Sequence, residues 1–219
     1  MTIKERYRRI IEYFSNNFPI AETELKYQNP FELIVAVILS AQCTDKRVNI
    51  IAPPLLAKFP DAETMAKAEP AEILEYIRSC SYPNNKAKHL SGMAKMLISD
   101  FGGEVPSEPL MLQRLPGVGR KTANVVASVV YGKPVMAVDT HVFRVSKRIG
   151  LVKNARSPLS AEIQLSGHIP LHLIRIAHHW LILHGRSVCK ARNPLCNQCG
   201  IRDCCKYYSE KTRNKKVYP

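Results

Sequence analysis

The sequence predicts an all-α protein. Apolar residues recur at helical spacing along most of the 219-residue chain, and capping residues or prolines mark where several of these segments begin. No convincing run of strand alternation is found among them. A chain of this length can bury a sizeable core, as one domain or as two small ones.

The first predicted helix covers residues 3–14, and Pro19 lies just beyond its end. The second follows the sequence Asn29-Pro30-Phe31-Glu32, in which an asparagine can cap the helix and a proline takes its first position. This helix continues through Leu39 with apolar side chains on nearly every side. We therefore expect it at the buried centre of a helical bundle.

Several shorter helices are expected next. One begins near Asp45, and Pro53-Pro54 should bend or break it. Asp61 and the step Glu69-Pro70 mark the starts of two more. A polar turn over residues 81–85 then precedes a helix over residues 86–100, and the pair Gly102-Gly103 should end that helix.

The segment Leu115-Pro116-Gly117-Val118-Gly119-Arg120-Lys121 predicts a helix, a tight hairpin and a second helix that opens at Arg120. Ser107 is placed to cap the first of these helices. Gly117 and Gly119 permit positive φ and close approach of the backbone, and the N–H groups that open the second helix point outward. We expect this hairpin to bind a backbone phosphate without reading nucleotide sequence.

Lys121 falls in the first turn of that second helix. The helix dipole and the neighbouring Arg120 both disfavour a positive charge there, and burial would strengthen the effect. A lysine in such a setting is a candidate nucleophile, because the neutral amine is the reactive form. A surface lysine that only donates to phosphate is the alternative, and spacing alone does not separate the two.

Asp139 follows an apolar stretch, residues 135–138, and is expected to cap a helix that runs through Lys147. A carboxylate bonded to backbone N–H groups stays ionised at neutral pH, and can orient water, stabilise positive charge on a sugar or accept a proton. A helix cap without a chemical role is the alternative. His141 is placed to reach a phosphate. Further helices are expected from Pro158 and from Pro170 to Gly185.

Five of the seven cysteines lie between residues 189 and 205. Four of them read Cys189-x6-Cys196-x2-Cys199-x5-Cys205, and four thiolates in one loop select zinc or an iron–sulfur cluster. Structural zinc usually uses two short Cys-x2-Cys knuckles, whereas this loop has one, so the spacing favours [4Fe–4S] and leaves zinc as the alternative. On composition alone Cys204 could replace Cys205.

Basic residues in the cysteine loop, and the two cysteines outside it, have separate predicted roles. Lys190 and Arg192 lie between the first two of the four cysteines and would form a stiff basic finger that contacts a second phosphate. A solvated loop whose charges offset the anionic cluster is the alternative. Cys43 and Cys80 are expected to be small buried hydrophobic residues.

The charge of the chain predicts a polyanionic partner. Thirty-two Lys and Arg against eighteen Asp and Glu leave a net charge of +14. Nucleic acid is favoured over a membrane surface. The N-terminus does not resemble a signal peptide, and no apolar run approaches the ~20 residues that span a bilayer. We expect a soluble intracellular protein.

Three segments together resemble the endonuclease III family of base-excision DNA glycosylases. Residues 115–126 resemble its helix-hairpin-helix, residues 138–144 (Val-Asp-Thr-His-Val-Phe-Arg) look like its acid motif, and residues 178–186 with the 6-2-5 cysteine spacing are similar to its cluster segment. A helix-hairpin-helix alone would be weak support. The ordered combination of lysine, acid and cluster is specific, and the likeness covers nearly the whole chain.

The resemblance implies a two-domain helix-hairpin-helix glycosylase: a six-helix domain over residues 22–133, and a [4Fe–4S] domain formed by residues 1–21 with 134–219. It implies that duplex DNA with an oxidised or ring-saturated pyrimidine, flipped out of the stack, is the substrate. Lys121 matches the nucleophile that attacks C1′ and forms a Schiff base before β-elimination, and Asp139 matches the assisting acid. The family pattern selects Cys205 over Cys204.

The resemblance also assigns two DNA-probing positions. Gln42 matches the residue that fills the hole left by the flipped base, and Asp45 matches a polar position nearby. Tyr82 departs from the pattern, because many members carry an apolar wedge there, and Pro83 follows where an aromatic residue is common. An aromatic wedge could stack on the orphaned base equally well.

Two alternatives accompany this interpretation. Adenine-mismatch glycosylases resemble the chain but typically lack a lysine at position 121 and carry an added C-terminal domain, for which the 14 residues after Cys205 leave no room. A non-catalytic DNA-binding module is the second alternative. We further expect a monomer that acts on double-stranded DNA, not on a membrane, in the cytoplasm and nucleoid of a bacterium.

Overall fold

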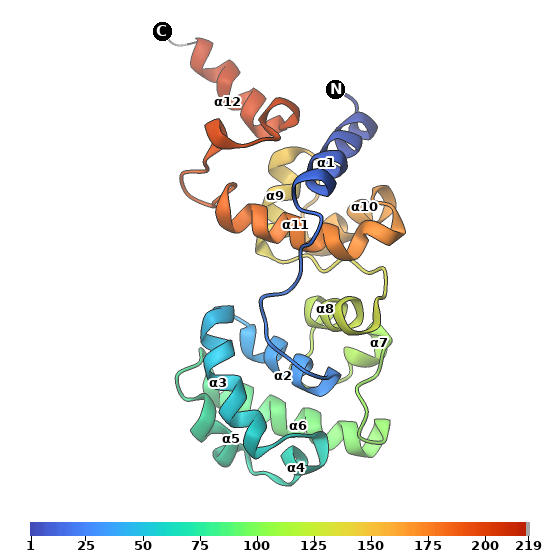
Figure 1. Ribbon diagram of the computed structural model, residues 1–219, viewed down its shortest axis with the longest axis vertical. Coiled ribbons are helices and arrows are strands. Elements are labelled where there is room, and N and C mark those ends of the chain that lie inside the picture. Colours follow the sequence, from blue (N-terminus) through green and yellow to red (C-terminus); the bar gives the residue numbers. More distant parts are fainter. Residues whose placement is uncertain (218–219) are drawn as a thin grey trace. The chain divides into compact units, whose positions relative to one another are not determined.

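The computed structural model describes residues 1–217 and the side chains of residues 1–212 (Figure 1). Within the described residues every regular element is an α-helix or a short 3-10 helix, so the predicted all-α fold is confirmed. The chain divides into two compact units. One is Thr23–Lys133, and the other joins Met1–Glu22 to the chain from Pro134 onward.

The unit Thr23–Lys133 is built around one apolar helix. Its helices are α2 (Pro30–Ser40), α3 (Asp45–Lys58), α4 (Ala62–Lys67), α5 (Pro70–Ile77), α6 (Pro83–Phe101), α7 (Pro109–Leu112) and α8 (Arg120–Tyr131). Asn29 caps α2 by accepting a hydrogen bond from the N–H of Glu32, as predicted. All seven side chains from Leu33 to Leu39 are at most 3% exposed, and α2 packs against α3, α6 and α8. The prediction of a buried central helix is confirmed.

Two helices in this unit have other boundaries than expected. Of the two outcomes expected at Pro53-Pro54, a bend or a break, the break does not occur, because helix α3 runs from Asp45 to Lys58 through both prolines. Both prolines lie on the exposed side, where carbonyl groups that lose their partners can bond to water, while the opposite face stays buried. Helix α6 begins at Pro83 and not at residue 86, because a proline at the first helical position needs no N–H partner.

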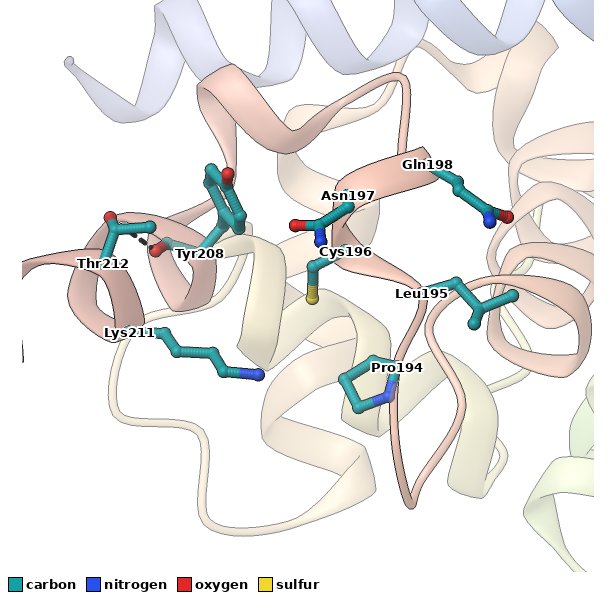
Figure 2. A pocket seen from close by; sticks show the side chains of 8 residues that line it. All are labelled: Pro194, Leu195, Cys196, Asn197, Gln198, Tyr208, Lys211 and Thr212. Carbon is teal, nitrogen blue, oxygen red and sulfur yellow. Dashed lines mark hydrogen bonds between the residues drawn. The ribbon is translucent and has the colours of Figure 1, made fainter. Parts of the chain in front are cut away.

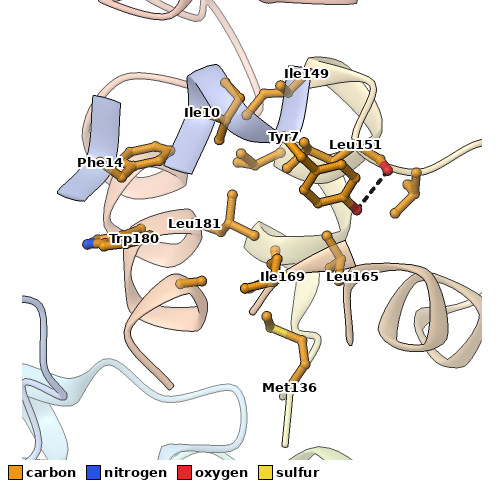
Figure 3. Close-up of a cluster of buried hydrophobic side chains, with 14 of the residues drawn as sticks. Tyr7, Ile10, Phe14, Met136, Ile149, Leu151, Leu165, Ile169, Trp180 and Leu181 are labelled. Carbon is orange, nitrogen blue, oxygen red and sulfur yellow. Dashed lines mark hydrogen bonds between the residues drawn. The ribbon is translucent and has the colours of Figure 1, made fainter. Parts of the chain in front are cut away.

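The second unit contains α1 (Ile3–Asn17), α9 (Thr140–Ile149), α10 (Pro158–His168), α11 (Ile174–Ser187) and α12 (Lys206–Val217), with 3-10 turns at Leu171–Leu173, Cys196–Gln198 and Arg202–Cys204. Its core joins α1 to the C-terminal half of the chain (Figure 3). Phe14 stacks on Trp180 with ring centroids 5.7 Å apart, and the Tyr7 hydroxyl donates to the Leu151 carbonyl at 2.9 Å. The N-terminal helix is therefore part of this core.

Two further expectations are corrected. Ser107 does not cap the first hairpin helix, because α7 starts at Pro109 with Glu108 at its cap position. Gly185 does not end α11, which continues to Ser187. A Cβ at position 185 would lie 3.0 Å from the Cβ of His141, so this glycine allows α11 to pack closely on α9.

Candidate nucleic-acid interface and metal centre

The hairpin between α7 and α8 depends on Gly117. Its φ is +80°, and a Cβ there would lie 2.8 Å from the Cβ of His89, so both conformation and space require glycine. Gly119 does not need this freedom, since its φ is −83° and a Cβ would meet nothing within 4 Å. Gly119 is instead the N-cap of α8 and provides no side-chain cap. The N–H groups of the first turn are thus left uncovered by a capping side chain.

Lys121 lies in the first turn of α8, and its side chain is exposed, as is that of Arg120. Helix α8 is buried from Ala123 to Ser128, and its only exposed residues, Arg120 and Lys121, lie in its first turn. The hairpin presents two cationic side chains beside uncapped N–H groups, an arrangement suited to an anionic ligand.

Two other exposed side chains of this unit, Gln42 and Tyr82, sit on unusual backbone. Gln42 lies between α2 and α3 with φ 55°, and Tyr82 lies between α5 and α6 with φ 54°. The Tyr82 side chain is 62% exposed. Positive φ is uncommon for residues with such side chains and accumulates at functional sites. The Ser81 hydroxyl donates to the Gln42 carbonyl at 2.7 Å, which ties the two loops together.

Sequence analysis missed Lys86, which is only 5% exposed. Its Nζ lies 2.7 Å from both the Leu39 and the Ala41 carbonyl oxygens and 3.0 Å from the Sγ of Cys80. A lysine in the polar first turn of α6 gave no signal of burial. Cys80 is buried as expected, but Cys43 is only half-buried, and partial burial raises the pKa of the Cys43 thiol with Cys80 adding to the effect.

In the other unit, Asp139 caps α9 as predicted. Its Oδ1 accepts a hydrogen bond from the N–H of Val142 at 2.7 Å, and the residue is half-buried. The preceding residues Met136–Val138 are buried. The Ala137 carbonyl accepts a hydrogen bond from Nδ1 of the buried His178 at 2.7 Å. Asp139 is thus fixed by its own helix and by a segment bonded to α11.

His141 lies one turn from Arg144 on α9. Arg144 Nη2 is 3.1 Å from His141 Nδ1, and because a guanidinium only donates, the ring nitrogen accepts. In a neutral ring the proton then sits on Nε2. His141 therefore retains a donor that could bind a phosphate oxygen.

The four predicted ligands, Cys189, Cys196, Cys199 and Cys205, line one cavity with Ile149, Val188 and Ile201. None is in a disulfide. Among residues 1–212 no group of three or more potential ligands is close enough to hold a single metal ion. The two observations are compatible, because each thiolate of an iron–sulfur cluster binds a different iron. Cys204 faces the core of the unit, and its thiol donates to the Ile201 carbonyl at 3.2 Å.

The cavity suits a group that stabilises thiolates. Burial raises the pKa of Cys199 to about 11 and raises that of Cys205 as well. Bound iron would favour the deprotonated sulfur of these residues instead. Cys196 also lines a neighbouring surface hollow with Pro194, Tyr208 and Lys211 (Figure 2). The four cysteines fit an all-thiolate cluster, and Cys196 also borders the surface hollow.

The loop that carries Lys190 and Arg192 is held by two arginines of α9 to which the sequence assigned no role. Both loop side chains are exposed. Arg148 donates to the carbonyls of Lys190 at 2.6 Å and Ala191 at 2.9 Å, and its Nη1 lies 3.7 Å from the Sγ of Cys189. Arg144 donates to the Cys189 carbonyl at 3.2 Å. The basic finger is therefore fixed at its base while its charged tips remain open.

The fold and these residues define a DNA repair protein of the helix-hairpin-helix class. Residues 35–170 match the family model of the HhH-GPD superfamily of base excision DNA repair proteins. The endonuclease III of Rickettsia conorii is 48% identical over 91% of this chain and 95% of its own length. That of Escherichia coli is 40% identical over 93% and 96%.

Solved structures of endonuclease III are similar to this chain as well. A trapped endonuclease III–DNA covalent intermediate (an estranged-adenine complex) has a TM-score of 0.92 and 42% identity, covering 97% of this chain and 100% of that one. A non-covalent endonuclease III–DNA complex also has a TM-score of 0.92, with 41% identity and the same coverage. A thermostable thymine-DNA glycosylase has the same fold, with a TM-score of 0.83 at 24% identity.

The chain belongs to the endonuclease III family. It is a bifunctional base excision repair enzyme, a DNA glycosylase with abasic-site lyase activity, and it binds DNA. Family membership favours this function over both alternatives considered from the sequence. None of the helices in residues 1–217 is long and apolar enough to cross a membrane.

Proposed function

We propose that Lys121 is the nucleophile of this enzyme and that its substrate is a damaged pyrimidine, oxidised or ring-saturated, in duplex DNA. The observation that carries the proposal is the position of Lys121 in the exposed first turn of α8, directly after the uncapped hairpin. A phosphate bound at the hairpin would bring deoxyribose to this amine.

The reaction begins when the neutral Lys121 amine attacks C1′ of the flipped nucleotide. The N-glycosidic bond breaks, and the base leaves with the electron pair and takes up a proton. Opening of the sugar ring gives an imine between Nζ and C1′. Loss of a proton from C2′ then expels the 3′ phosphate, which cuts the strand, and hydrolysis of the imine restores the amine.

Asp139 is proposed to assist this chemistry as a carboxylate. Its cap bond to Val142 leaves Oδ2 available, and the half-buried position keeps the charge partly shielded from water. A carboxylate can stabilise the positive charge that develops on the sugar and accept the proton released by the attacking amine. Capping and catalysis are compatible because they use different oxygens.

Gln42 and Tyr82 are proposed to probe the duplex. Both are exposed, and the bond from Ser81 to Gln42 couples their loops. Gln42 would fill the space left by the flipped nucleotide, and the Tyr82 ring would stack on the orphaned base. His141, Arg120, Lys190 and Arg192 would contact phosphates.

Cys189, Cys196, Cys199 and Cys205 are proposed to hold a [4Fe–4S] cluster. When bound, the cluster supplies a rigid, covalently ligated brace for the loop. Lys190 and Arg192 then bind phosphate from a finger whose base is fixed by Arg144 and Arg148. In this proposal the unit Thr23–Lys133 supplies the hairpin and probing loops, and the other unit supplies Asp139 and the cluster.

Lys121→Ala tests the proposed nucleophile. We expect the variant to bind lesion-containing duplex and to lose strand cleavage by at least about a thousandfold. Lys95→Ala, which removes an exposed positive charge from α6 of the same unit, is the matched control and should cleave like wild type. Cleavage by Lys121→Ala at the control rate would exclude Lys121 as the nucleophile.

Metal analysis tests the cluster. The holoprotein should contain four iron and four inorganic sulfide per chain. Cys196→Ala should lose iron, whereas Cys204→Ala, which removes a thiol that faces the core, should keep it. Stoichiometric zinc in place of iron would exclude the cluster.

The proposal also includes the oligomeric state and the cellular location of the enzyme. The enzyme would act as a monomer, which the mass of the free protein in solution by light scattering would check. Its substrate would be the chromosome in a bacterial cytoplasm, at the nucleoid, since the relatives compared above are bacterial proteins.

A further inference from the structure

The C-terminal end of α2 and the start of α6 meet at a buried ammonium group. Lys86 Nζ lies 2.7 Å from the carbonyl oxygens of Leu39 and Ala41 and 3.0 Å from the Sγ of Cys80. Two of these partners are backbone carbonyls and the third is a cysteine sulfur, and the residue is 5% exposed. Burying a lysine side chain is unfavourable unless all of its donors are satisfied, and here three N–H groups meet three acceptors.

The contacts of the Lys86 side chain lie next to the two probing residues, Gln42 and Tyr82. Ala41 directly precedes Gln42, and Cys80 lies two residues before Tyr82. Lys86 therefore binds the backbone carbonyl directly before Gln42 and the side chain of a residue two positions before Tyr82. The carbonyls it binds end α2, where the helix dipole is negative and favours a cation.

Both probing residues have left-handed backbone, with φ 55° at Gln42 and 54° at Tyr82. A side chain is seldom held in this region unless neighbouring contacts enforce it. The bonds to Ala41 and Cys80, together with the Ser81 hydroxyl bond to Gln42 at 2.7 Å, are contacts of this kind. They connect the two loops to each other and to one buried point.

We infer that Lys86 is a positioning residue that presets Gln42 and Tyr82 in the geometry that enters the duplex. This inference rests on the proposed function of those two side chains. Lys86 itself touches neither DNA nor the reacting atoms. Its effect on the reaction passes through Gln42 and Tyr82, so it should vanish when they are removed.

The test compares Lys86→Met with wild type in single-turnover base release from duplex containing thymine glycol. We expect the rate to fall about tenfold to a hundredfold, because a misplacement of about 1 Å is costly in preorganised sites. The dissociation constant for undamaged duplex and its salt dependence should stay at wild-type values, since the ammonium is buried and makes no phosphate contact. Lys95→Met is the matched control and should react at the wild-type rate.

A mutant cycle separates positioning from general destabilisation. In a background that carries both Gln42→Ala and Tyr82→Ala, adding Lys86→Met should slow the reaction no further than about twofold. If Lys86→Met lowered the rate of base release as much in this background as in wild type, the inference would be overturned, because Lys86 would then act independently of Gln42 and Tyr82. A wild-type rate for Lys86→Met alone would overturn it as well.

If Lys86→Met does not fold, Ser81→Ala decides the question, because it cuts only the hydroxyl bond between the two loops. We expect Ser81→Ala to lower the rate of base release by about threefold or more, and this decrease should disappear in the Gln42→Ala, Tyr82→Ala background. Ser99→Ala on α6 is the matched control. A wild-type rate for Ser81→Ala would then overturn the inference. If wild-type enzyme itself releases no base and forms no imine with DNA, the proposed function fails first, and that outcome is distinct from either result above.

Discussion

Asp139 has two roles in this account, and one substitution separates them. Asparagine caps helices about as well as aspartate, so Asp139→Asn should leave the free energy of unfolding within about 0.5 kcal/mol of wild type. The loss of the carboxylate should lower base release and strand cleavage by about a hundredfold or more. Asp139→Ala should lose the same activity and in addition about 1 kcal/mol of stability. Full activity in Asp139→Asn would leave this residue as a helix cap only.

Gly117 is the residue on which the hairpin conformation depends. Gly117→Ala would place a Cβ at φ +80° and 2.8 Å from the Cβ of His89, so we expect a loss of about 1 to 3 kcal/mol in the free energy of unfolding. Gly119→Ser is the matched control for stability, because its φ is −83°, space is open and serine is a good N-cap. Denaturant unfolding of the two variants measures the difference. Equal stabilities would contradict the assigned role of Gly117.

For single residues, the sequence predicts those roles that depend only on neighbours along the chain. The cap at Asp139 and the positive φ at Gly117 follow from a few neighbouring residues, and the structure contains both. Lys86 and Arg148 were missed because their partners lie 47 and 42 residues away, at Leu39 and Lys190. No local pattern encodes such pairs, since they form only after the chain has folded.

Among the elements, α9 braces the basic finger through the carbonyls of its base. Arg148→Met should free the loop near Lys190 and Arg192, so trypsin should cut there several times faster than in wild type. Lys153→Met removes an exposed charge from the same unit and is the matched control. Iron content should be measured in parallel, so that cleavage of cluster-free protein is not counted. An unchanged rate of cleavage would show that the finger does not need Arg148.

Helix α11 buries His179, and this makes the second unit sensitive to acid. Burial, together with repulsion from Arg175 and Arg186, lowers the pKa of His179 to about 4, against about 6.5 in the unfolded chain. Between pH 6.5 and 4 the unfolded chain therefore binds more protons, and the free energy of unfolding falls as the pH is lowered. The contribution of His179 is roughly 3 kcal/mol over this range.

His179→Gln measures that contribution, because glutamine is polar but does not titrate. We expect its free energy of unfolding to decline less than that of wild type from pH 6.5 to 4, and the two to run parallel above pH 7. The effect of carboxylate titration on stability is the same in both proteins, so it cancels in the comparison. Parallel curves across the whole range would contradict the lowered pKa of His179.

Helix boundaries show where sequence reasoning about elements succeeds and fails. The caps at Asn29 and Asp61 start helices as predicted, because each side chain bonds to the N–H three residues ahead. The expected break at Pro53-Pro54 fails because tertiary burial of the opposite face maintains α3. Burial is set by the rest of the fold, which local propensity does not contain.

On the scale of the whole molecule, a net charge of +14 and the exposed cations at the hairpin and finger predict DNA binding that is strongly salt-dependent. The all-α fold was accessible from periodicity, and the function from three motifs in order. The grouping of Met1–Glu22 with the chain beyond Pro134 is a long-range feature, which depends on pairs such as Phe14 with Trp180. Periodicity marks both residues as buried but does not identify them as partners.

Reductive trapping tests whether the Lys121 amine bonds covalently to deoxyribose. Wild-type protein incubated with abasic-site duplex and borohydride should give a stable protein–DNA adduct, and peptide mapping by mass spectrometry should place the adduct on Lys121. Lys121→Ala should give none. The absence of an adduct with wild type, or an adduct that persists in Lys121→Ala, would contradict the account.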